Sequence, residues 1–379
     1  MVCYVEADRC RMNTKVRPFY VVIKAVCLFV LINFVYALIA PPIAGISIYN
    51  AIVPGLERMP FGSGADPYTL TIDNADAMFA AHKISAEKAS DEIRVALIGD
   101  SSIWGENLLP EDTLAAQWNR LNLQCDGKRL KFYNLGYPHP SIIKDLIFIE
   151  EVKEKQPDVI LWFVTLNTLM NQYRINPFLT GNRVRALQLM DTYDIPFAPR
   201  SLLSQGANGF YEKTIVGQRS FLARWIKLQA LSLVWLATGT DLHVAIMNHE
   251  TPPADVRKSP NYRDLEPGAD LSASLLLEAL PAGHDLADGI PLVLVNEPIF
   301  VANGLHSDIR YNDLYPSWAY DQYRENVAAQ AQTASLTYLD MWNVIPPKYF
   351  TDTPLHLNAE GERLLVEQLN PTLLTTVCP

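Results

Sequence analysis

The sequence predicts a three-layer α/β/α fold with a central parallel sheet, preceded by a membrane-spanning helix. Apolar runs of strand length recur along the chain, and helical patterns lie between them. A strand buried on both faces reads as a continuous apolar run, and regular alternation with helices is typical of a parallel sheet covered on both sides. A long apolar segment near the start of the chain predicts the membrane helix.

Five segments are predicted as strands, at residues 94–98, 130–134, 159–165, 291–295 and 336–340. The helical patterns between and after them cover residues 113–123, 142–155, 318–334 and 362–374. Roughly 120 residues separate the third strand from the fourth, which is too long for a loop in a compact domain. We therefore predict that residues 170–290 form an insertion that caps the fold.

The N-terminal apolar segment, residues 19–40, is interrupted only by Lys24 and Asn33. At about 1.5 Å per residue, a helix of this length crosses a hydrocarbon core of about 30 Å. Two prolines end it at 41 and 42. A cleaved signal peptide and a buried core helix are the competing interpretations.

Basic residues precede this segment, namely Arg9, Arg11, Lys15 and Arg17. Positive charge stays on the cytoplasmic side of a membrane, so we expect residues 1–18 in the cytoplasm and everything after the anchor outside. Residues 41–92 then form a juxtamembrane connector, and residues 93–379 form the folded domain with its cap.

Within the cap, residues 221–238 are predicted as a helix. It either packs on the core or lies on the membrane, with Trp225 and Trp235 at head-group depth.

The charge balance limits the partners of this protein. There are 31 basic and 41 acidic residues, a formal net charge of −10, so a nucleic-acid backbone is not an expected partner.

Of the five cysteines, Cys125 and Cys378 fall on the predicted outer side and could form a disulfide there. No Cys-x-x-Cys or His-rich spacing suggests a metal, and no cofactor is expected.

The stretch at residues 95–105 carries the strongest chemical signal, because a buried apolar run leads directly into Gly-Asp-Ser. It points to acyl-ester chemistry at Ser101. A serine hydroxyl is a weak nucleophile at neutral pH and needs a histidine within hydrogen-bond reach, oriented by a carboxylate. Asp352 and His356 lie on one short turn before the last helical pattern, and they complete the order Ser, Asp, His. Asp340, after the final strand, is the fallback acid.

Four separated blocks resemble the SGNH, or GDSL-type, hydrolase superfamily in that family's order. They are Gly-Asp-Ser-Ser at 99–102, Asn-Leu-Gly-Tyr-Pro at 134–138, Thr-Leu-Asn-Thr at 165–168 and Asp to His at 352–356. The third block matches only at Asn167, because the family's usual glycine and following aspartate are absent. The last block has one residue more between acid and base than the usual Asp-x-x-His.

The resemblance implies an oxyanion hole formed by the N–H of Gly136, the side chain of Asn167 and the N–H of Ser101. Such donors stabilise the charge that develops on the carbonyl oxygen in acyl transfer, by about 3 kcal/mol each. Thr165 replaces the family's glycine, so its side chain is expected either to narrow the hole or to add a hydroxyl. Glu297 follows the fourth strand and is expected either to contact substrate or to serve in a turn. Arg310, on the loop just after it, is the candidate for binding an anionic or glycan substrate.

The first functional hypothesis is a membrane-anchored serine esterase or O-acyltransferase that acts outside the cytoplasm on an acylated glycan of the cell envelope or another small ester. Ser101 attacks, His356 transfers the proton and Asp352 orients His356. Resemblance to anchored proteins of envelope polysaccharide acylation implies two partners, the lipid bilayer and a membrane-bound O-acyltransferase. The alternative is an inactive scaffold of the same fold that binds a glycan or a membrane acyltransferase.

Overall fold

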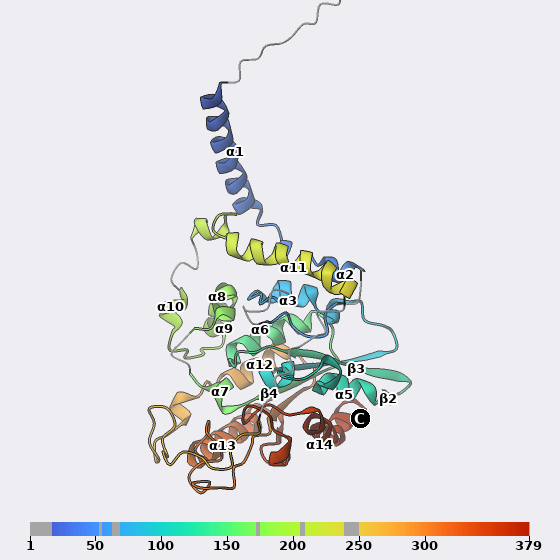
Figure 1. Cartoon of the computed structure of the whole chain (residues 1–379), viewed down its shortest axis with the longest axis vertical. Coiled ribbons are helices and arrows are strands. Elements are labelled where there is room, and N and C mark those ends of the chain that lie inside the picture. The colour runs from blue at the N-terminus through green and yellow to red at the C-terminus, as the bar shows by residue number, and fades with distance from the viewer. Residues whose placement is uncertain are drawn as a thin grey trace, which may run out of the picture. The chain divides into compact units, whose positions relative to one another are not determined.

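The computed structural model describes residues 17–52, 55–62, 69–171, 175–204, 209–238 and 250–378 (Figure 1). The chain divides into two compact units. The first comprises Met1–Pro41 and Asn208–Leu222, and the second comprises Pro42–Ala207 and Ala223–Pro379.

A six-stranded sheet in the order β2-β3-β1-β4-β5-β6 forms the centre of the second unit. Its strands are β1 (Glu92–Gly99), β2 (Gln124–Cys125), β3 (Lys128–Gly136), β4 (Val159–Val164), β5 (Leu292–Asn296) and β6 (Thr337–Asp340). Every neighbouring pair is parallel except β2 with β3, so the predicted fold class is confirmed with one difference. The two-residue β2 turns back through Gly127, whose φ of 76° suits glycine, and pairs antiparallel at the edge.

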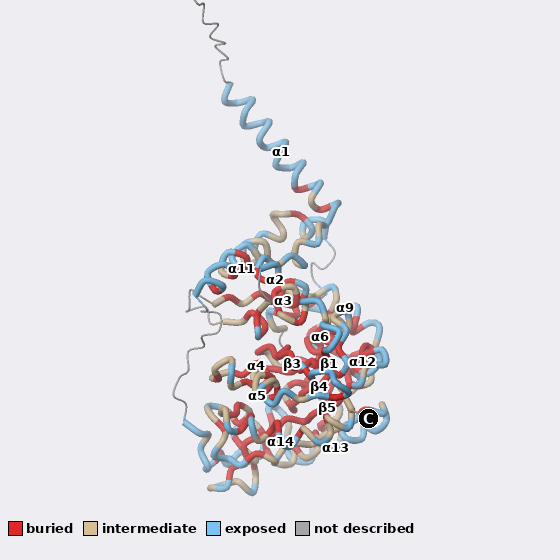
Figure 2. The backbone as a smooth tube through the Cα atoms, turned by 90° about the vertical axis from the view of Figure 1, so that its right-hand side faces the viewer, coloured by how far each residue is buried: buried red, intermediate tan, exposed pale blue. Residues whose placement is uncertain are grey.

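The central strands are buried on both faces, as their apolar sequences predict. Every residue of β1, β4 and β5 is buried. Figure 2 shows that buried residues concentrate on these strands and on the sides of the neighbouring helices. The side chains of such strands alternate between two helix layers, which gives the three-layer architecture.

Helices α5 (Leu114–Arg120) and α14 (Ala359–Val377) cover one face of the sheet. Trp118 of α5 and Leu365 of α14 share a core cluster with Val95 and Val293. On the other face lie α6 (Ile142–Lys153), α12 (Ala279–Ala287) and α13 (Ser317–Thr333). Figure 1 shows α6 and α14 on opposite sides of the strands.

The remaining helices precede the sheet, follow the ends of β1 and β4, or belong to the predicted insertion. They are α1 (Pro18–Ile39), α2 (Ile48–Ile52), α3 (Ala75–Ala81), α4 (Ser101–Trp104), α7 (Leu166–Leu169), α8 (Pro177–Gly181), α9 (Arg183–Thr192), α10 (Arg200–Ser204) and α11 (Arg219–Thr238). The region predicted as a cap, residues 170–290, also contains α12. Two parallel strands require a crossover, and α12 provides it between β4 and β5.

Helix α1 is long and apolar enough to cross a membrane. Two of its residues are buried, Asn33 and Ala37, both in its last two turns. Asn33 accepts a hydrogen bond from the N–H of Val216 at 3.1 Å and donates to the carbonyl of Phe29 at 3.0 Å. The polar residue that interrupts the apolar segment therefore has partners inside this unit.

One face of α11 packs within the second unit. Gln229 of α11 accepts from the N–H of Ile48 at 2.8 Å and donates to the carbonyl of Ile46 at 3.3 Å. Trp225 donates to the same carbonyl at 3.3 Å, and Trp235 is only 4% exposed. The prediction that Trp235 reaches lipid head groups is therefore wrong, because its ring lies on the packed face.

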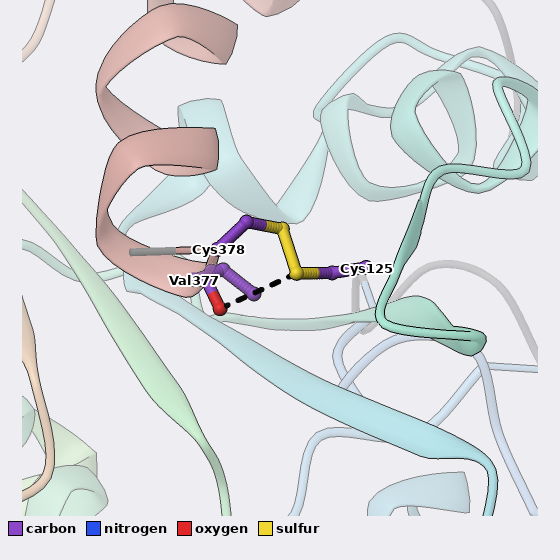
Figure 3. Close-up of a disulfide and its surroundings, with 3 residues drawn as sticks. All are labelled: Cys125, Val377 and Cys378. Atoms are coloured by element: carbon purple, nitrogen blue, oxygen red, sulfur yellow. Dashed lines mark hydrogen bonds between the residues drawn. A yellow bond between two sulfur atoms is a disulfide. The ribbon is translucent and has the colours of Figure 1, made fainter.

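A disulfide joins Cys125 of β2 to Cys378, with Cα atoms 5.8 Å apart. Figure 3 shows the bond beside Val377, at the end of α14. It links the edge of the sheet to the last helix across a sequence separation of 253 residues. Closing so long a loop restricts the unfolded chain, which is how a disulfide stabilises a fold.

Replacing Cys125 by Ser should lower the free energy of unfolding by about 2–5 kcal/mol, because the unfolded chain regains that freedom. Thermal unfolding of the purified chain measures the effect. A reducing agent should lower the melting temperature of the wild type and leave that of the variant unchanged. The matched control is Cys27→Ser, since Cys27 carries a free thiol on α1. Equal melting temperatures for wild type and C125S would contradict this role of the disulfide.

Candidate active site

The first site residue, Ser101, stands where the central strand β1 ends. Asp100 caps α4 by accepting a hydrogen bond from the N–H of Ser102 at 3.2 Å, so Ser101 opens the helix. Gly105 ends this single turn with a φ of 82°, a conformation that glycine adopts without strain. The short strand–turn–helix thus presents the Ser101 hydroxyl at the carboxyl edge of the sheet, where sites form in parallel α/β folds.

The structure brings Ser101, His356 and Asp352 together. The Ser101 Oγ lies 2.8 Å from Nε2 of His356, and Nδ1 of His356 lies 2.9 Å from Oδ1 of Asp352. A carboxylate only accepts hydrogen bonds, so Nδ1 carries the proton and Nε2 accepts from the serine hydroxyl. Asp340, the fallback acid, is excluded because it accepts from Asn296 and Arg324.

The extra residue between acid and base is absorbed by a tight turn. Thr353 accepts a hydrogen bond from the N–H of His356 at 3.2 Å, and the N–H of Thr351 donates to the carbonyl of His356 at 2.9 Å. Asn107 donates to the same Asp352 oxygen as the imidazole, at 2.9 Å. The wider spacing therefore still directs Asp352 toward its histidine, with help from the segment that follows α4.

Two opposing effects act on the pKa of His356. Burial, at 6% exposure, lowers it. The hydrogen bond to Asp352, together with the charges of Asp352, Glu106 and Asp100, raises it by more, so the pKa ends above its ordinary value. The carboxylates therefore stabilise the imidazolium that forms when His356 accepts a proton.

The side chain of Asn167 is held by the insertion. Asn167 lies in α7, directly after β4, and its Oδ1 accepts hydrogen bonds from the hydroxyl of Tyr262 at 3.0 Å and from Arg263 at 3.3 Å. With both donors on the oxygen, Nδ2 is the end of the amide that can donate. Sequence reasoning missed Tyr262, since nothing in its local pattern connects it to a residue 95 positions earlier.

Thr165 acts as a helix cap. Its hydroxyl accepts from the N–H of Thr168 at 3.4 Å and lies 3.1 Å from the Thr168 hydroxyl, which closes a capping box on α7. Neither of the expected effects on the oxyanion hole is seen. The side chain is fully buried and bonded to its own helix.

Gly136 does not have the role that the sequence predicts for it. Its N–H donates to Oδ1 of Asn134 at 3.0 Å, so this donor is already engaged. A Cβ at position 136 would come within 2.2 Å of the backbone nitrogen of Trp104. The residue is glycine because the α4 turn packs directly against β3.

A strained residue lies three positions further along the same loop. His139 has a φ of 109°, which is unfavourable for a side chain with a Cβ, and prolines flank it on both sides. Among the described residues, its backbone N–H donates to no chain atom. His139 is therefore a candidate oxyanion donor in place of Gly136. The flanking prolines are visible in the sequence, but the sign of φ at His139 is not.

Glu297 was predicted to contact substrate, and the structure contradicts this. The Glu297 side chain is buried, with the residue 2% exposed, and it accepts a hydrogen bond from the hydroxyl of Ser102, a residue of the nucleophile turn. Burial raises the pKa of Glu297 well above its usual range, and the charge of Asp100 raises it further. A carboxyl group so enclosed supports the Asp100–Ser102 turn and cannot reach a ligand at the surface.

Arg310 is likewise enclosed, with no exposed surface. Its guanidinium donates to the carbonyls of Ser259 at 2.9 Å, Asn261 at 3.1 Å and Asp313 at 3.0 Å. Burial, followed by repulsion from Arg257, lowers the pKa of Arg310 to about 10. The prediction that Arg310 grips substrate is therefore wrong. It anchors the segment that presents Tyr262 to Asn167.

Comparison with known proteins gives weak but consistent likenesses. No family model matches the chain, and no curated protein matches it. A carbohydrate acetylesterase family member from Sinorhizobium meliloti is similar in structure, with a TM-score of 0.33 and 12% identity over 75% of this chain and 98% of its own. A member of the lipolytic G-D-S-L family from Veillonella parvula has a TM-score of 0.34 and 11% identity, over 73% and 96%.

A third solved structure is the salicylyl-acyltransferase SsfX3 from a tetracycline biosynthetic pathway, with a TM-score of 0.33 and 14% identity, over 76% of this chain and 56% of that one. Because the TM-scores and identities are low, the function proposed below is argued from this chain's own side chains.

Replacing Asp352 by Asn should lower the pKa of His356, because the negative charge that raises it is removed and an amide oxygen is a weaker acceptor, while burial, which lowers it, remains. An NMR titration of the histidine-labelled protein measures this directly. The matched control is Asp340→Asn, which removes a carboxylate that does not touch the imidazole. An unchanged His356 titration in D352N would show that Asp352 is not its electrostatic partner.

Proposed function

We propose that this protein is a membrane-anchored serine O-acyl esterase or acyltransferase, acting outside the cytoplasm on an acylated glycan of the cell envelope. The observation that carries the proposal is the Ser101–His356–Asp352 chain, with contacts of 2.8 Å and 2.9 Å. Nucleophile, base and orienting acid in hydrogen-bond contact are the geometric signature of covalent acyl transfer.

In the first half of the reaction, the Ser101 Oγ attacks the acyl carbonyl while Nε2 of His356 takes the hydroxyl proton. The C–O π bond opens to an alkoxide, giving a tetrahedral intermediate. His356, now an imidazolium stabilised by Asp352, returns the proton to the leaving alcohol as the ester bond breaks. The acyl group remains on Ser101 as an ester.

In the second half, an acceptor hydroxyl replaces the leaving alcohol. His356 takes its proton, the acceptor oxygen attacks the Ser101 ester, and the proton returns to the Ser101 Oγ as the serine leaves. Water as acceptor completes hydrolysis, and a sugar hydroxyl completes transfer. Both outcomes use the same three residues, so the exclusion of water from the site decides between them.

Three donors are proposed for the oxyanion: the backbone N–H of Ser101, the Nδ2 of Asn167 and the backbone N–H of His139. All three follow the carboxyl ends of adjacent strands, β1, β4 and β3. The Ser101 N–H belongs to the first turn of α4, where backbone donors lack helical acceptors. The Asn167 amide is oriented by Tyr262.

Helix α1 and the disulfide support the proposed cellular setting. A single apolar helix preceded by basic residues favours a cytoplasmic N-terminus and an extracytoplasmic domain. A disulfide between Cys125 and Cys378 is stable in an oxidising compartment, which fits that orientation. The proposed partners are the bilayer and, by resemblance alone, a membrane-bound O-acyltransferase.

A fluorophosphonate probe should label the wild-type chain covalently at Ser101, and Ser101→Ala should abolish that labelling. Ser102→Ala serves as the neighbouring control and should keep it, because the Ser102 hydroxyl is bonded to Asp100 and Glu297. Release or transfer of acyl groups on purified envelope glycan should be lost in parallel in S101A. If wild-type and S101A chains bind the glycan equally and neither releases nor transfers acyl groups, the scaffold interpretation replaces this one.

Asn167→Ala should lower kcat on the order of a hundredfold, because one oxyanion donor is lost. Tyr262→Phe should lower kcat by about fivefold with KM little changed, since it removes the hydroxyl that orients that donor, and hydrogen bonds of this kind are worth about 1 kcal/mol. In the N167A background, Y262F should have no further effect, because Tyr262 acts through Asn167. Additive losses would show that Tyr262 acts independently.

A further inference from the structure

The exposed face of α11 is apolar, which is the reverse of an ordinary surface helix. Its solvent-facing stripe consists of Ile226, Ala230, Leu233, Val234 and Ala237. These residues follow one another at helical intervals of three and four, so they form one continuous face. Ile226 is 60% exposed and Leu233 is 49% exposed. This set is called the outer face below.

Two polar side chains of the same helix, Gln229 and Arg224, bond to other segments of the second unit and hold its orientation. Gln229 is buried and bonds both the N–H of Ile48 and the carbonyl of Ile46. Arg224 pairs with the buried Asp73 at 3.0 Å. These contacts fix the rotation of α11 about its axis, so the apolar stripe cannot turn inward without breaking them.

Chain connectivity keeps the outer face near the exit of α1 from its membrane. Ile46, which α11 contacts through Gln229 and Trp225, is separated from the end of α1 at Ile39 by residues 40–45. The seven residue steps from Ile39 to Ile46 reach about 25 Å at most. This limit holds at any angle between the two compact units.

The other end of α11 is tied to the same part of α1. Val216, three residues before α11 begins, donates to Asn33, and Gln218 accepts from the hydroxyl of Tyr36 at 3.0 Å. Asn33 lies six residues before the end of α1, a depth of about 9 Å along a helix. The segment that leads into α11 is therefore held beside the last two turns of α1.

Charge on α11 also fits a lipid surface. The helix carries Arg219, Arg224 and Lys227 and no aspartate or glutamate. Exposed apolar side chains continue beside it on the 43–52 segment, at Ile46 and Ile52. An apolar stripe bordered by basic residues is the pattern of a helix that lies in the interface of a membrane containing anionic lipid.

From these observations we propose that the outer face of α11 lies in the head-group region of the membrane that α1 crosses, in contact with lipid. The 43–52 segment and α11 then form an in-plane platform, which holds the second unit against the bilayer by a contact additional to the anchor. The proposal requires α1 to span the membrane and does not depend on the catalytic role of Ser101.

The test uses the full chain in nanodiscs containing phosphatidylcholine and phosphatidylglycerol, with Cys3, Cys10 and Cys27 replaced by Ser and the disulfide retained. A nitroxide is attached to Ala230→Cys or to Leu233→Cys. Collision rates with oxygen, which concentrates in lipid, and with a water-soluble nickel complex are compared. Labels at both positions should collide more often with oxygen than with nickel.

Matched controls use other exposed leucines of the chain. Labels at Leu121→Cys and Leu305→Cys, which are 49% and 66% exposed outside α11, should favour the nickel complex. A label at Leu28→Cys on α1 reports whether the anchor itself is in lipid. If Leu28 favours oxygen while positions 230 and 233 match position 305, the platform is refuted and the anchor stands.

Two further outcomes would also overturn the proposal. A label at position 28 that favours nickel would remove its premise, since α1 would not be inserted. In native membranes, a photoreactive side chain at position 233 that couples to another protein rather than to lipid would assign the outer face to a protein partner. Nitroxide collision rates measured in the Ser101→Ala variant should match those of the chain with Ser101 intact. The membrane test is therefore independent of the proposed enzyme activity.

Discussion

The buried ammonium of Lys144 connects the two loops on which the rest of the site depends. It donates to the carbonyl of Gly99 at 2.6 Å and to that of Tyr137 at 3.2 Å, at the carboxyl ends of neighbouring strands. Asp145 balances the charge at 3.0 Å, and both side chains are fully buried. Burial raises the pKa of Asp145, which Lys144 opposes. Removing one partner of such a pair costs about 3–5 kcal/mol, so the nucleophile turn and the β3 loop are rigidly joined.

The site also depends on a segment from far along the chain. Arg310 donates to the carbonyls of Ser259 and Asn261 and thereby fixes the backbone before Tyr262. Tyr262 in turn orients the amide of Asn167. The indole of Trp318 adds a hydrogen bond to the carbonyl of Pro260 at 2.7 Å. An aromatic hydroxyl from the insertion thus orients the Asn167 amide, which is proposed to donate to the oxyanion. The insertion is thus joined to the catalytic edge by directional bonds.

Much of the architecture could be predicted because its determinants are local. The strands that became β1, β4 and β5 are unbroken apolar runs, and α5, α6, α13 and α14 occupy the predicted helical stretches to within a few residues. The nucleophile block and the Asp352–His356 turn each lie in one short segment. The first follows the strand β1 and the second precedes the helix α14, and the sequence marks both of these element ends. A parallel sheet then brings such strand ends to one edge, whatever the details of packing. The two-residue β2 escaped prediction because it has no pattern of its own and exists only by pairing with β3.

The tertiary structure alone decided where individual side chains and backbone N–H groups point and how far each is buried. Glu297 and Arg310 look like surface ligands in sequence, yet distant segments enclose both of them. Gly136 reads as an oxyanion donor, but its N–H was taken by Asn134 and its missing Cβ made room for α4. The sequence by itself determined the order of the elements and the residue types at the site, since these follow from periodicity and chemistry. Only folding decided which donors face the nucleophile and which side of α11 faces outward, because both depend on contacts between residues far apart in the chain.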